Sequence, residues 1–122
     1  IIDDCLDLLS KEQESGKDAG CDFKMAELTL PLLNLFSVEA GDQKWLVTLL
    51  KQRDDKAAFS QIKESFIHSE ALSQTKGEAL FYVQKAKVEL AGLKNSEFKE
   101  SLINLADHVV ERVNDWEYGK NI

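Results

Sequence analysis

Apolar residues recur along much of this chain at steps of three and four positions, the spacing that places side chains on one face of an α-helix. Strand-like alternation does not persist anywhere in the sequence, so the pattern predicts an all-α protein with about five or six helices. Residues 1–10 are predicted to be the last turns of a first helix, whose apolar face includes Ile1, Ile2, Cys5, Leu6 and Leu9.

A polar stretch separates this first helix from a second one that is apolar nearly throughout. Residues 11–28 are predicted to form a long loop, and loops of this length inside a compact domain are usually functional. Residues 30–38 (LPLLNLFSV) are predicted to form a short buried helix. Thr29 is its expected N-cap, and Pro31 lies in the first turn, where proline is tolerated.

Four further helices are predicted in the rest of the chain. Asp54 or Asp55 is expected to cap the second of them, Ser69 begins the third, and the last has the most regular amphipathic pattern. Their apolar faces are formed in turn by Trp45, Leu46, Leu49 and Leu50; by Phe59, Ile62 and Phe66; by Ala79, Leu80, Val83, Ala86 and Leu90; and by Phe98, Leu102, Leu105, Val109, Val113 and Trp116.

The charge of the chain excludes some classes of partner. Its 122 residues contain 15 basic and 22 acidic side chains, which gives a net charge of −7. Nucleic acids and anionic membrane surfaces are bound by basic faces, so both are disfavoured. The charge is compatible with a divalent cation held between acidic residues and a phosphorylated ligand.

Other features of the sequence concern its cellular location. No apolar run approaches the roughly 20 residues needed to cross a bilayer, and no signal-peptide pattern occurs. Cys5 and Cys21 have no metal-site spacing and are expected to be free thiols in a reducing compartment. We therefore expect a cytoplasmic protein without an integral membrane segment.

Three aspartates near the start of the chain, Asp3, Asp4 and Asp7, form a D-D-x-x-D pattern. On a helix, residues i and i+4 lie one turn apart on the same face, where two carboxylates repel each other unless a cation lies between them. Mg²⁺ is commonly bound by one or two carboxylates together with water and substrate phosphate. The pattern suits Mg²⁺ held against a diphosphate, but taken alone it is also typical of a solvated helix face.

Two further motifs follow the aspartates. Residues 16–22 read G-K-D-A-G-C-D and residues 29–33 read T-L-P-L-L. In this order the three motifs resemble the C-terminal part of the trans-isoprenyl diphosphate synthases, the polyprenyl synthetase family, from the second aspartate-rich motif onward. The closing helix, with Val109, Val110 and Arg112, is similar to the last helix of that family, so the resemblance extends over essentially the whole chain.

The resemblance implies the C-terminal helices of the isoprenoid synthase fold, with the second aspartate-rich motif at residues 3–7, a loop at 11–28 and a helical bundle at 29–118. It also implies a prenyltransferase of isoprenoid biosynthesis, which condenses isopentenyl diphosphate with an allylic diphosphate. Magnesium would be its cofactor, because bound Mg²⁺ stabilises the departing diphosphate.

The resemblance also assigns roles to individual residues. Asp3, Asp4 and Asp7 would bind the metal, Asp3 and Asp7 most directly. Lys17 would contact diphosphate oxygens, although a lysine between glycines is also an ordinary solvated loop residue. Asp22 would fix the loop or the water shell of the metal, and capping of its own loop is an equally good interpretation.

The sequence departs from the family pattern at a few positions. Ala26 and Glu27 stand where the family usually has a Gly-Lys pair. Because that lysine would face the allylic diphosphate, Glu27 reverses a charge there, which Lys24 could offset. Asp18 and Lys94 stand where the family has proline, commonly in the first case and often in the second.

The family's first aspartate-rich motif and its isopentenyl-diphosphate-binding residues do not occur in these 122 residues. We therefore expect the isolated chain to be inactive, and to expose apolar surface, for example on helix 30–38, that favours a homo-oligomer. The alternative is a non-catalytic helical interaction module, or a truncated paralogue that pairs with a complete synthase. A terpene cyclase of the same fold is less favoured, because its second metal motif contains Asn and Ser or Thr ligands.

Overall fold

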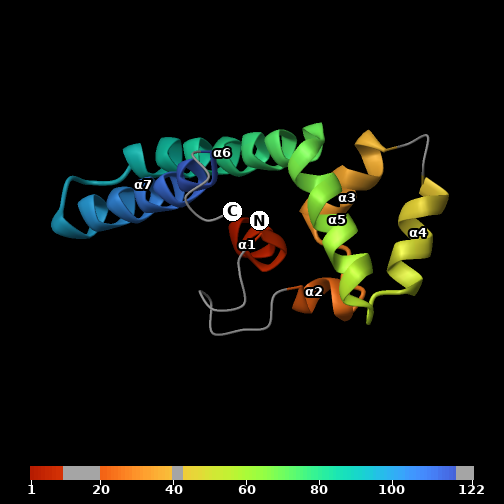
Figure 1. Ribbon diagram of the computed structural model, residues 1–122. Coiled ribbons are helices and arrows are strands. Elements are labelled where there is room, and N and C mark those ends of the chain that lie inside the picture. Colours follow the sequence, from red (N-terminus) through yellow and green to blue (C-terminus); the bar gives the residue numbers. More distant parts are fainter. Residues whose placement is uncertain (10–19, 40–42, 118–122) are drawn as a thin grey trace.

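The computed structural model describes residues 1–9, 20–39 and 43–117, and the side chains of these residues as far as 112. All regular structure in these ranges is helical, in agreement with the all-α prediction. The helices are α1 (Ile2–Leu9), α2 (Cys21–Lys24), α3 (Leu30–Val38), α4 (Gln43–Lys51), α5 (Lys56–His68), α6 (Glu70–Ala91) and α7 (Glu97–Glu117) (Figure 1). The unexpected element is α2, a short helix inside the stretch 11–28 that the sequence predicted to be a loop.

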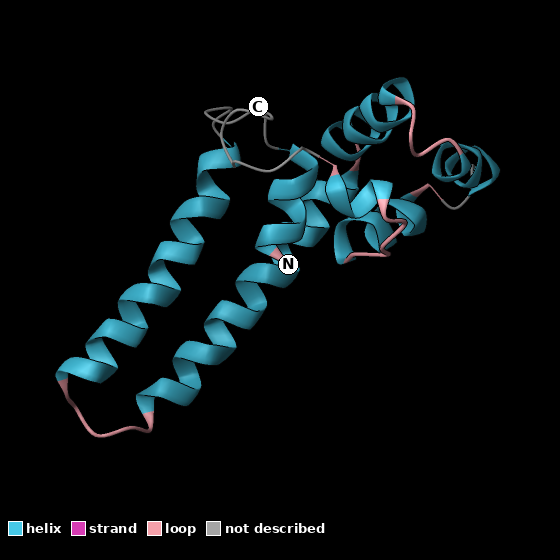
Figure 2. Ribbon diagram, turned by 90° about the horizontal axis from the view of Figure 1, so that it is seen from below, coloured by secondary structure: helices cyan, strands magenta, loops and turns pink. Residues whose placement is uncertain are grey.

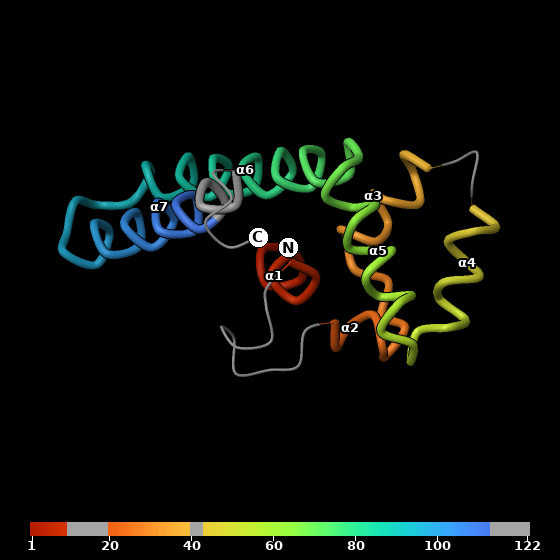
Figure 3. Tube along the Cα trace, in the orientation of Figure 1, coloured from red at the N-terminus to blue at the C-terminus, as the bar shows by residue number. Residues whose placement is uncertain are grey.

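The helices form two parts, a body and a projecting hairpin. α1 to α5 and the beginning of α6 make up the body, in which α3 packs against α6 and α5, and α4 packs against α5. The rest of α6 and α7 form a long antiparallel hairpin that extends away from the body (Figure 2). α7 runs back along α6 and contacts α1, so the last described helix lies beside the first (Figure 3).

The core of the body confirms most of the predicted apolar faces. Each of the helices α1 to α5 contributes to it, and Ala71 adds the first turn of α6. In the predicted apolar face that begins at Trp45, Leu46 and Leu49 are buried in this core, while Trp45 and Leu50 are partly buried beside them. The cluster consists of Cys5, Leu8, Leu9, Phe23, Leu32, Leu35, Leu46, Leu49, Ala58, Ile62, Phe66 and Ala71.

The predicted helix starts at Thr29, Asp55 and Ser69 are confirmed. The Asp55 carboxylate accepts a hydrogen bond from the Ala57 amide at 2.9 Å, which caps α5. Thr29 occupies the N-cap position of α3, but its side chain makes no capping hydrogen bond, and its carbonyl accepts the first helical hydrogen bond from the Leu33 amide at 2.9 Å.

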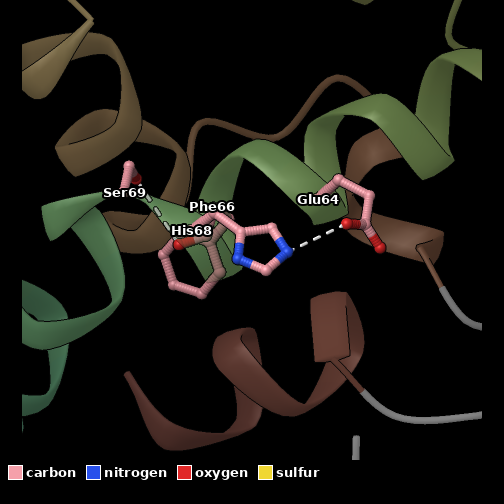
Figure 4. A network of polar contacts seen from close by, with 4 residues as sticks. All are labelled: Glu64, Phe66, His68 and Ser69. Carbon is pink, nitrogen blue, oxygen red and sulfur yellow. Dashed lines mark hydrogen bonds and ion pairs between the residues drawn. The ribbon is translucent and has the colours of Figure 1, made fainter.

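Ser69 links α5 to α6. Its hydroxyl accepts a hydrogen bond from the Ala71 amide at 3.2 Å, which caps the start of α6. The same hydroxyl donates a hydrogen bond to the Phe66 carbonyl at 3.4 Å, at the end of α5 (Figure 4). Near this turn, the exposed His68 Nε2 lies within hydrogen-bonding distance, 3.1 Å, of a Glu64 carboxylate oxygen. Ser69 is therefore the single residue between α5 and α6, and its hydrogen bonds set the direction in which α6 leaves the body.

A polar network that the sequence did not predict connects α3 to α6. Asn34 lies in the apolar run of α3 and is 9% exposed. Its amide group donates to the Thr75 hydroxyl at 2.9 Å and to the Glu78 carboxylate at 3.1 Å. Thr75 in turn donates to the Ala71 carbonyl at 2.7 Å. Because a buried amide must be paired, this network favours one register between the two helices.

Two expectations about apolar surface are corrected by the structure. Helix 30–38 is mostly covered, since Pro31, Leu32, Asn34 and Leu35 are buried, and Leu33 is its one strongly exposed large apolar side chain, at 48%. Most of the exposed large apolar side chains of the described residues lie on the hairpin, where the predicted inward residues Leu80 and Ala86 are exposed. On α7 the predicted apolar face is open as well, with Phe98 84%, Leu102 45% and Leu105 61% exposed.

These apolar side chains are exposed because, among the described residues, the outer hairpin consists of two helices only, α6 and α7. α6 and α7 cover each other, and Lys87 forms an ion pair with Asp107 between them. No third element of the described residues lies over their shared apolar groove, which includes Val83, Leu90, Leu102 and Val109. Val113 and Trp116, the last members of the predicted face, have side chains outside the described residues.

Candidate functional site

The three aspartates of the D-D-x-x-D pattern lie on α1, and the structure gives them different surroundings. Asp3 points into solvent, with 91% of its side chain exposed. Asp4 is 38% exposed, and Asp7 is partly covered. Cys5, between them in sequence, faces the opposite way and is buried in the core. The buried face of α1 therefore fixes the helix, while its acidic face remains open at Asp3.

Asp7 is engaged by the main chain of α2. One carboxylate oxygen accepts a hydrogen bond from the Cys21 amide at 3.1 Å, and the other accepts from the Asp22 amide at 3.0 Å. The carbonyl of Asp7 also accepts from the Gly20 amide at 2.9 Å. These amides belong to the first turn of α2, where the helix provides no partner for them. Asp7 therefore holds α2 against α1, which the sequence did not predict.

Gly20, the second glycine of the G-K-x-x-G-x-D motif, is required by this arrangement. Its φ is +78°, in the left-handed region that favours glycine. A Cβ added at Gly20 would meet the Phe59 ring at 2.5 Å. Phe59 also packs against Phe23 of α2, with ring centroids 5.9 Å apart. The glycine therefore lets the chain turn into α2 while it touches an aromatic pair.

The segment after α2 contains the positions that depart from the family pattern. Ala26 has φ +56°, an uncommon value for a residue with a Cβ, at the place where the family usually has glycine. Glu27 is exposed, and its amide donates to the Asp22 carbonyl at 2.9 Å. The Asp22 amide thus donates a hydrogen bond to the Asp7 carboxylate, and the Asp22 carbonyl accepts one from the Glu27 amide.

Two arginines that the sequence did not assign to the site contact its elements. Arg53, after α4, donates to the Lys24 carbonyl at 3.1 Å and to the Leu50 carbonyl at 3.4 Å, so it ties the end of α2 to the end of α4. Arg112 reaches from α7 to α1, where its guanidinium lies 3.6 Å from a carboxylate oxygen of Asp3. The only sequence signal for Arg112 was its place in the closing pattern.

Lys17, the predicted diphosphate contact, lies outside the described residues, as do Gly16 and Asp18. The structure therefore places Asp3 and Asp7 on α1 and joins Asp7 to the backbone of Asp22, and it does not place Lys17 relative to them.

The described residues fit magnesium only as a partial donor set. No group of three His, Cys, Asp or Glu side chains in the described part of the chain could enclose a metal ion. The open carboxylate of Asp3 suits one coordination position, and each oxygen of Asp7 retains accepting capacity beyond its amide hydrogen bond. Such a donor set suits Mg²⁺, which usually takes the rest of its octahedron from water and phosphate.

The two cysteines are free thiols in contrasting surroundings. Cys21 is exposed, whereas Cys5 is 1% exposed in the core. Burial raises the pKa of the Cys5 thiol from its usual 9.0 to about 12. Cys21 contacts the Asp7 carboxylate through its backbone amide and not through its thiol.

None of the described helices combines the length and the apolar character required to cross a membrane.

Comparisons with known proteins identify the family. No family model matches the chain, and no solved structure matches it significantly. It is similar to the short chain isoprenyl diphosphate synthase of Methanothermobacter thermautotrophicus, with 34% identity over 113 residues, which are 92% of this chain and 34% of that protein.

Two further curated relatives match the same share of the chain. The probable mitochondrial hexaprenyl pyrophosphate synthase of Neurospora crassa is 32% identical over 114 residues, 92% of this chain and 24% of that protein. Component 2 of the heptaprenyl diphosphate synthase of Bacillus subtilis is 29% identical over 112 residues, 92% of this chain and 32% of that protein. The chain spans about a third or less of the length of these relatives. Its curated homologues over about 92% of the chain are trans-prenyl diphosphate synthases, and the chain matches a C-terminal fragment of that family.

Proposed function

We propose that this chain is part of a prenyltransferase that condenses isopentenyl diphosphate with an allylic diphosphate, and that it supplies the second Mg²⁺–diphosphate-binding motif. The observation that carries the proposal is the similarity over 92% of the chain to proteins named as prenyl diphosphate synthases. The open carboxylate of Asp3 on a helix fixed by its buried face supports it.

In this proposal the three aspartates act differently. Asp3 and Asp4 face the metal and the diphosphate from α1. Asp7 contributes a metal ligand and, through its hydrogen bonds to the Cys21 and Asp22 amides, holds α2 in place. Magnesium bound at this motif would neutralise negative charge on the diphosphate as it leaves.

Lys17 and Asp22 are proposed to complete the diphosphate site. Lys17 would add a point charge to the phosphate oxygens. Asp22 is bonded through its backbone to Asp7 and Glu27, which supports its role in fixing the loop. Glu27 is exposed beside this loop, so we expect it to weaken diphosphate binding relative to a lysine at the same position.

Binding of inorganic pyrophosphate with and without Mg²⁺, measured by titration calorimetry on the protein expressed from its complete reading frame, tests this proposal. We expect binding to require Mg²⁺ and to weaken about tenfold in Asp3→Asn, because one metal ligand is lost. Asp54→Asn is the matched control, since Asp54 is an exposed acidic residue outside α1 and should leave binding unchanged. Metal-independent binding, or equal effects of the two variants, would contradict the proposal.

A second experiment tests the expectation for the isolated chain. Incubated with Mg²⁺, an allylic diphosphate and isopentenyl diphosphate, it should form no product, because the sequence lacks the first aspartate-rich motif and the reaction needs both motifs in register. Product formation by these 122 residues would refute that expectation.

The second candidate function is a helical interaction module that pairs with a complete synthase. The open apolar groove between α6 and α7 favours it, since exposed apolar surface of this kind often marks a contact with another protein. An interaction module of this type would bind no pyrophosphate in the presence of Mg²⁺, so the calorimetric experiment separates the two candidates.

Homo-oligomerisation and a cytoplasmic location complete the proposal. Sedimentation of the purified protein measures the first. Cell fractionation measures the second, and recovery in a mitochondrial or membrane fraction would contradict it.

A further inference from the structure

An ion pair joins the two ends of the described chain at the candidate metal motif. Arg112 lies on α7 and Asp3 on α1, and their charged groups are 3.6 Å apart. The Arg112 side chain is 39% exposed, whereas Asp3 is 91% exposed. The pair thus connects the last helix directly to the carboxylate that is most open to a ligand.

The geometry of this pair leaves both groups able to bind something else. A separation of 3.6 Å is longer than a hydrogen bond, so the guanidinium donors are not committed to Asp3. The contact involves Oδ1 of Asp3, and the second oxygen of this carboxylate remains open. Exposed pairs of this kind contribute little to stability, which makes a purely structural role a poor explanation.

We infer that Arg112 is a positioning residue of the Mg²⁺–diphosphate site: it holds the Asp3 carboxylate while the site lacks a ligand and attracts the diphosphate when the metal complex binds. This inference rests on the proposed function of the motif. Arginine suits the role because its planar group of donors matches phosphate oxygens.

Electrostatics predicts effects of opposite sign on two ligands. Arg112 repels free Mg²⁺ and competes with it for Asp3, so removing its charge should strengthen the binding of Mg²⁺ alone. The complex of Mg²⁺ with pyrophosphate is negatively charged, so the same change should weaken its binding. An interaction that served only to hold α7 in place would shift both affinities in the same direction.

Calorimetric titration of Arg112→Gln tests the inference in the protein expressed from its complete reading frame. We expect Mg²⁺ alone to bind about threefold tighter and Mg²⁺–pyrophosphate to bind about fivefold weaker, the size expected for one screened charge near contact distance. Arg112→Lys keeps the charge and should restore the affinity for Mg²⁺ alone, but only part of the affinity for Mg²⁺–pyrophosphate, because the planar fork is lost.

Two matched variants test whether these changes in affinity arise from the Arg112–Asp3 ion pair. Lys94→Gln removes the same charge from the turn between α6 and α7, where the side chain is exposed, and should leave both affinities unchanged. In an Asp3→Asn background, Arg112→Gln should tighten Mg²⁺ binding less, because the Asp3 carboxylate for which Arg112 competes is gone and only the charge repulsion is relieved.

The outcomes separate this inference from the function it rests on. If the unmodified protein binds pyrophosphate with Mg²⁺ and Asp3→Asn weakens that binding, but Arg112→Gln shifts both affinities in one direction or behaves like Lys94→Gln, the inference alone is overturned. If the unmodified protein shows no Mg²⁺-dependent pyrophosphate binding, the proposed function is overturned together with it.

Discussion

At the scale of single residues, two positions near α2 have a positive φ and respond to substitution in opposite ways. Ala26 has φ +56°, so Ala26→Gly should stabilise the protein by about 1 kcal/mol, since a left-handed conformation is costly only for a residue with a Cβ. Gly20→Ala should destabilise it by about 2–4 kcal/mol, because strain at φ +78° adds to the collision with Phe59. Urea unfolding of both variants measures these changes in the free energy of unfolding. A loss of stability in Ala26→Gly would contradict the left-handed conformation of residue 26.

The buried thiol of Cys5 gives a pH dependence at the same scale. Its pKa is raised from 9.0 to about 12 by burial, so between these values the unfolded chain loses a proton that the folded protein keeps. The stabilisation is complete below about pH 9 and is lost as pH rises toward 12. Urea unfolding across this range should therefore show a decrease that is smaller in Cys5→Ala. Equal pH dependence in the two proteins would show that Cys5 is not responsible.

At the scale of elements, the junction between α1 and α2 depends on one side chain. Asp7→Ala removes the acceptors of two amides at the start of α2 and should destabilise the protein by about 1–3 kcal/mol. Asp3→Ala is the matched control on the same helix; it should change stability by less than about 0.5 kcal/mol, because Asp3 is 91% exposed. Thermal and urea unfolding without metal measure both, and equal losses would show that Asp7 does not hold α2.

The connection between α3 and α6 depends on the buried amide of Asn34. Asn34→Ala should cost about 2 kcal/mol, because it leaves the Thr75 hydroxyl and the Glu78 carboxylate without this partner. Ser37→Ala on the exposed side of α3 is the control and should be nearly neutral. If Asn34→Ala were as stable as the unmodified protein, the network would not fix the contact between these helices.

At the scale of the whole molecule, the open hairpin should govern self-association. Leu105 is 61% exposed and lines the apolar groove, so Leu105→Lys should lower the oligomer fraction while changing stability by less than about 0.5 kcal/mol. Val47→Lys on α4, at a position that is 43% exposed and away from the groove, is the control. Sedimentation velocity measures the oligomer fraction. Equal sedimentation of both variants and the unmodified protein would exclude the groove as the contact surface.

The sequence by itself determined every described helix except the short α2. Periodic apolar positions predicted the helices, and the cap residues Asp55 and Ser69 marked two of their starts, because both signals act within a few residues of the chain. The order of the D-D-x-x-D, G-K-x-x-G-x-D and T-L-P motifs can also be read without a tertiary structure. It indicated the same family as the curated relatives. The roles of Asp3, Asp4, Asp7, Lys17 and Asp22 as ligands remain predictions.

Tertiary structure decided what each element faces. The periodicity of α6 and α7 predicted apolar faces but could not show that the outer hairpin lacks a covering layer, because burial depends on neighbours far away in sequence. The same reason explains Asp7, whose partners are 14 and 15 residues away, and Arg112, which meets Asp3 only because α7 runs back to α1. The pattern of the chain specified helices and an acidic motif, and long-range packing determined that Asp7 supports α2 while Asp3 stays open beside Arg112.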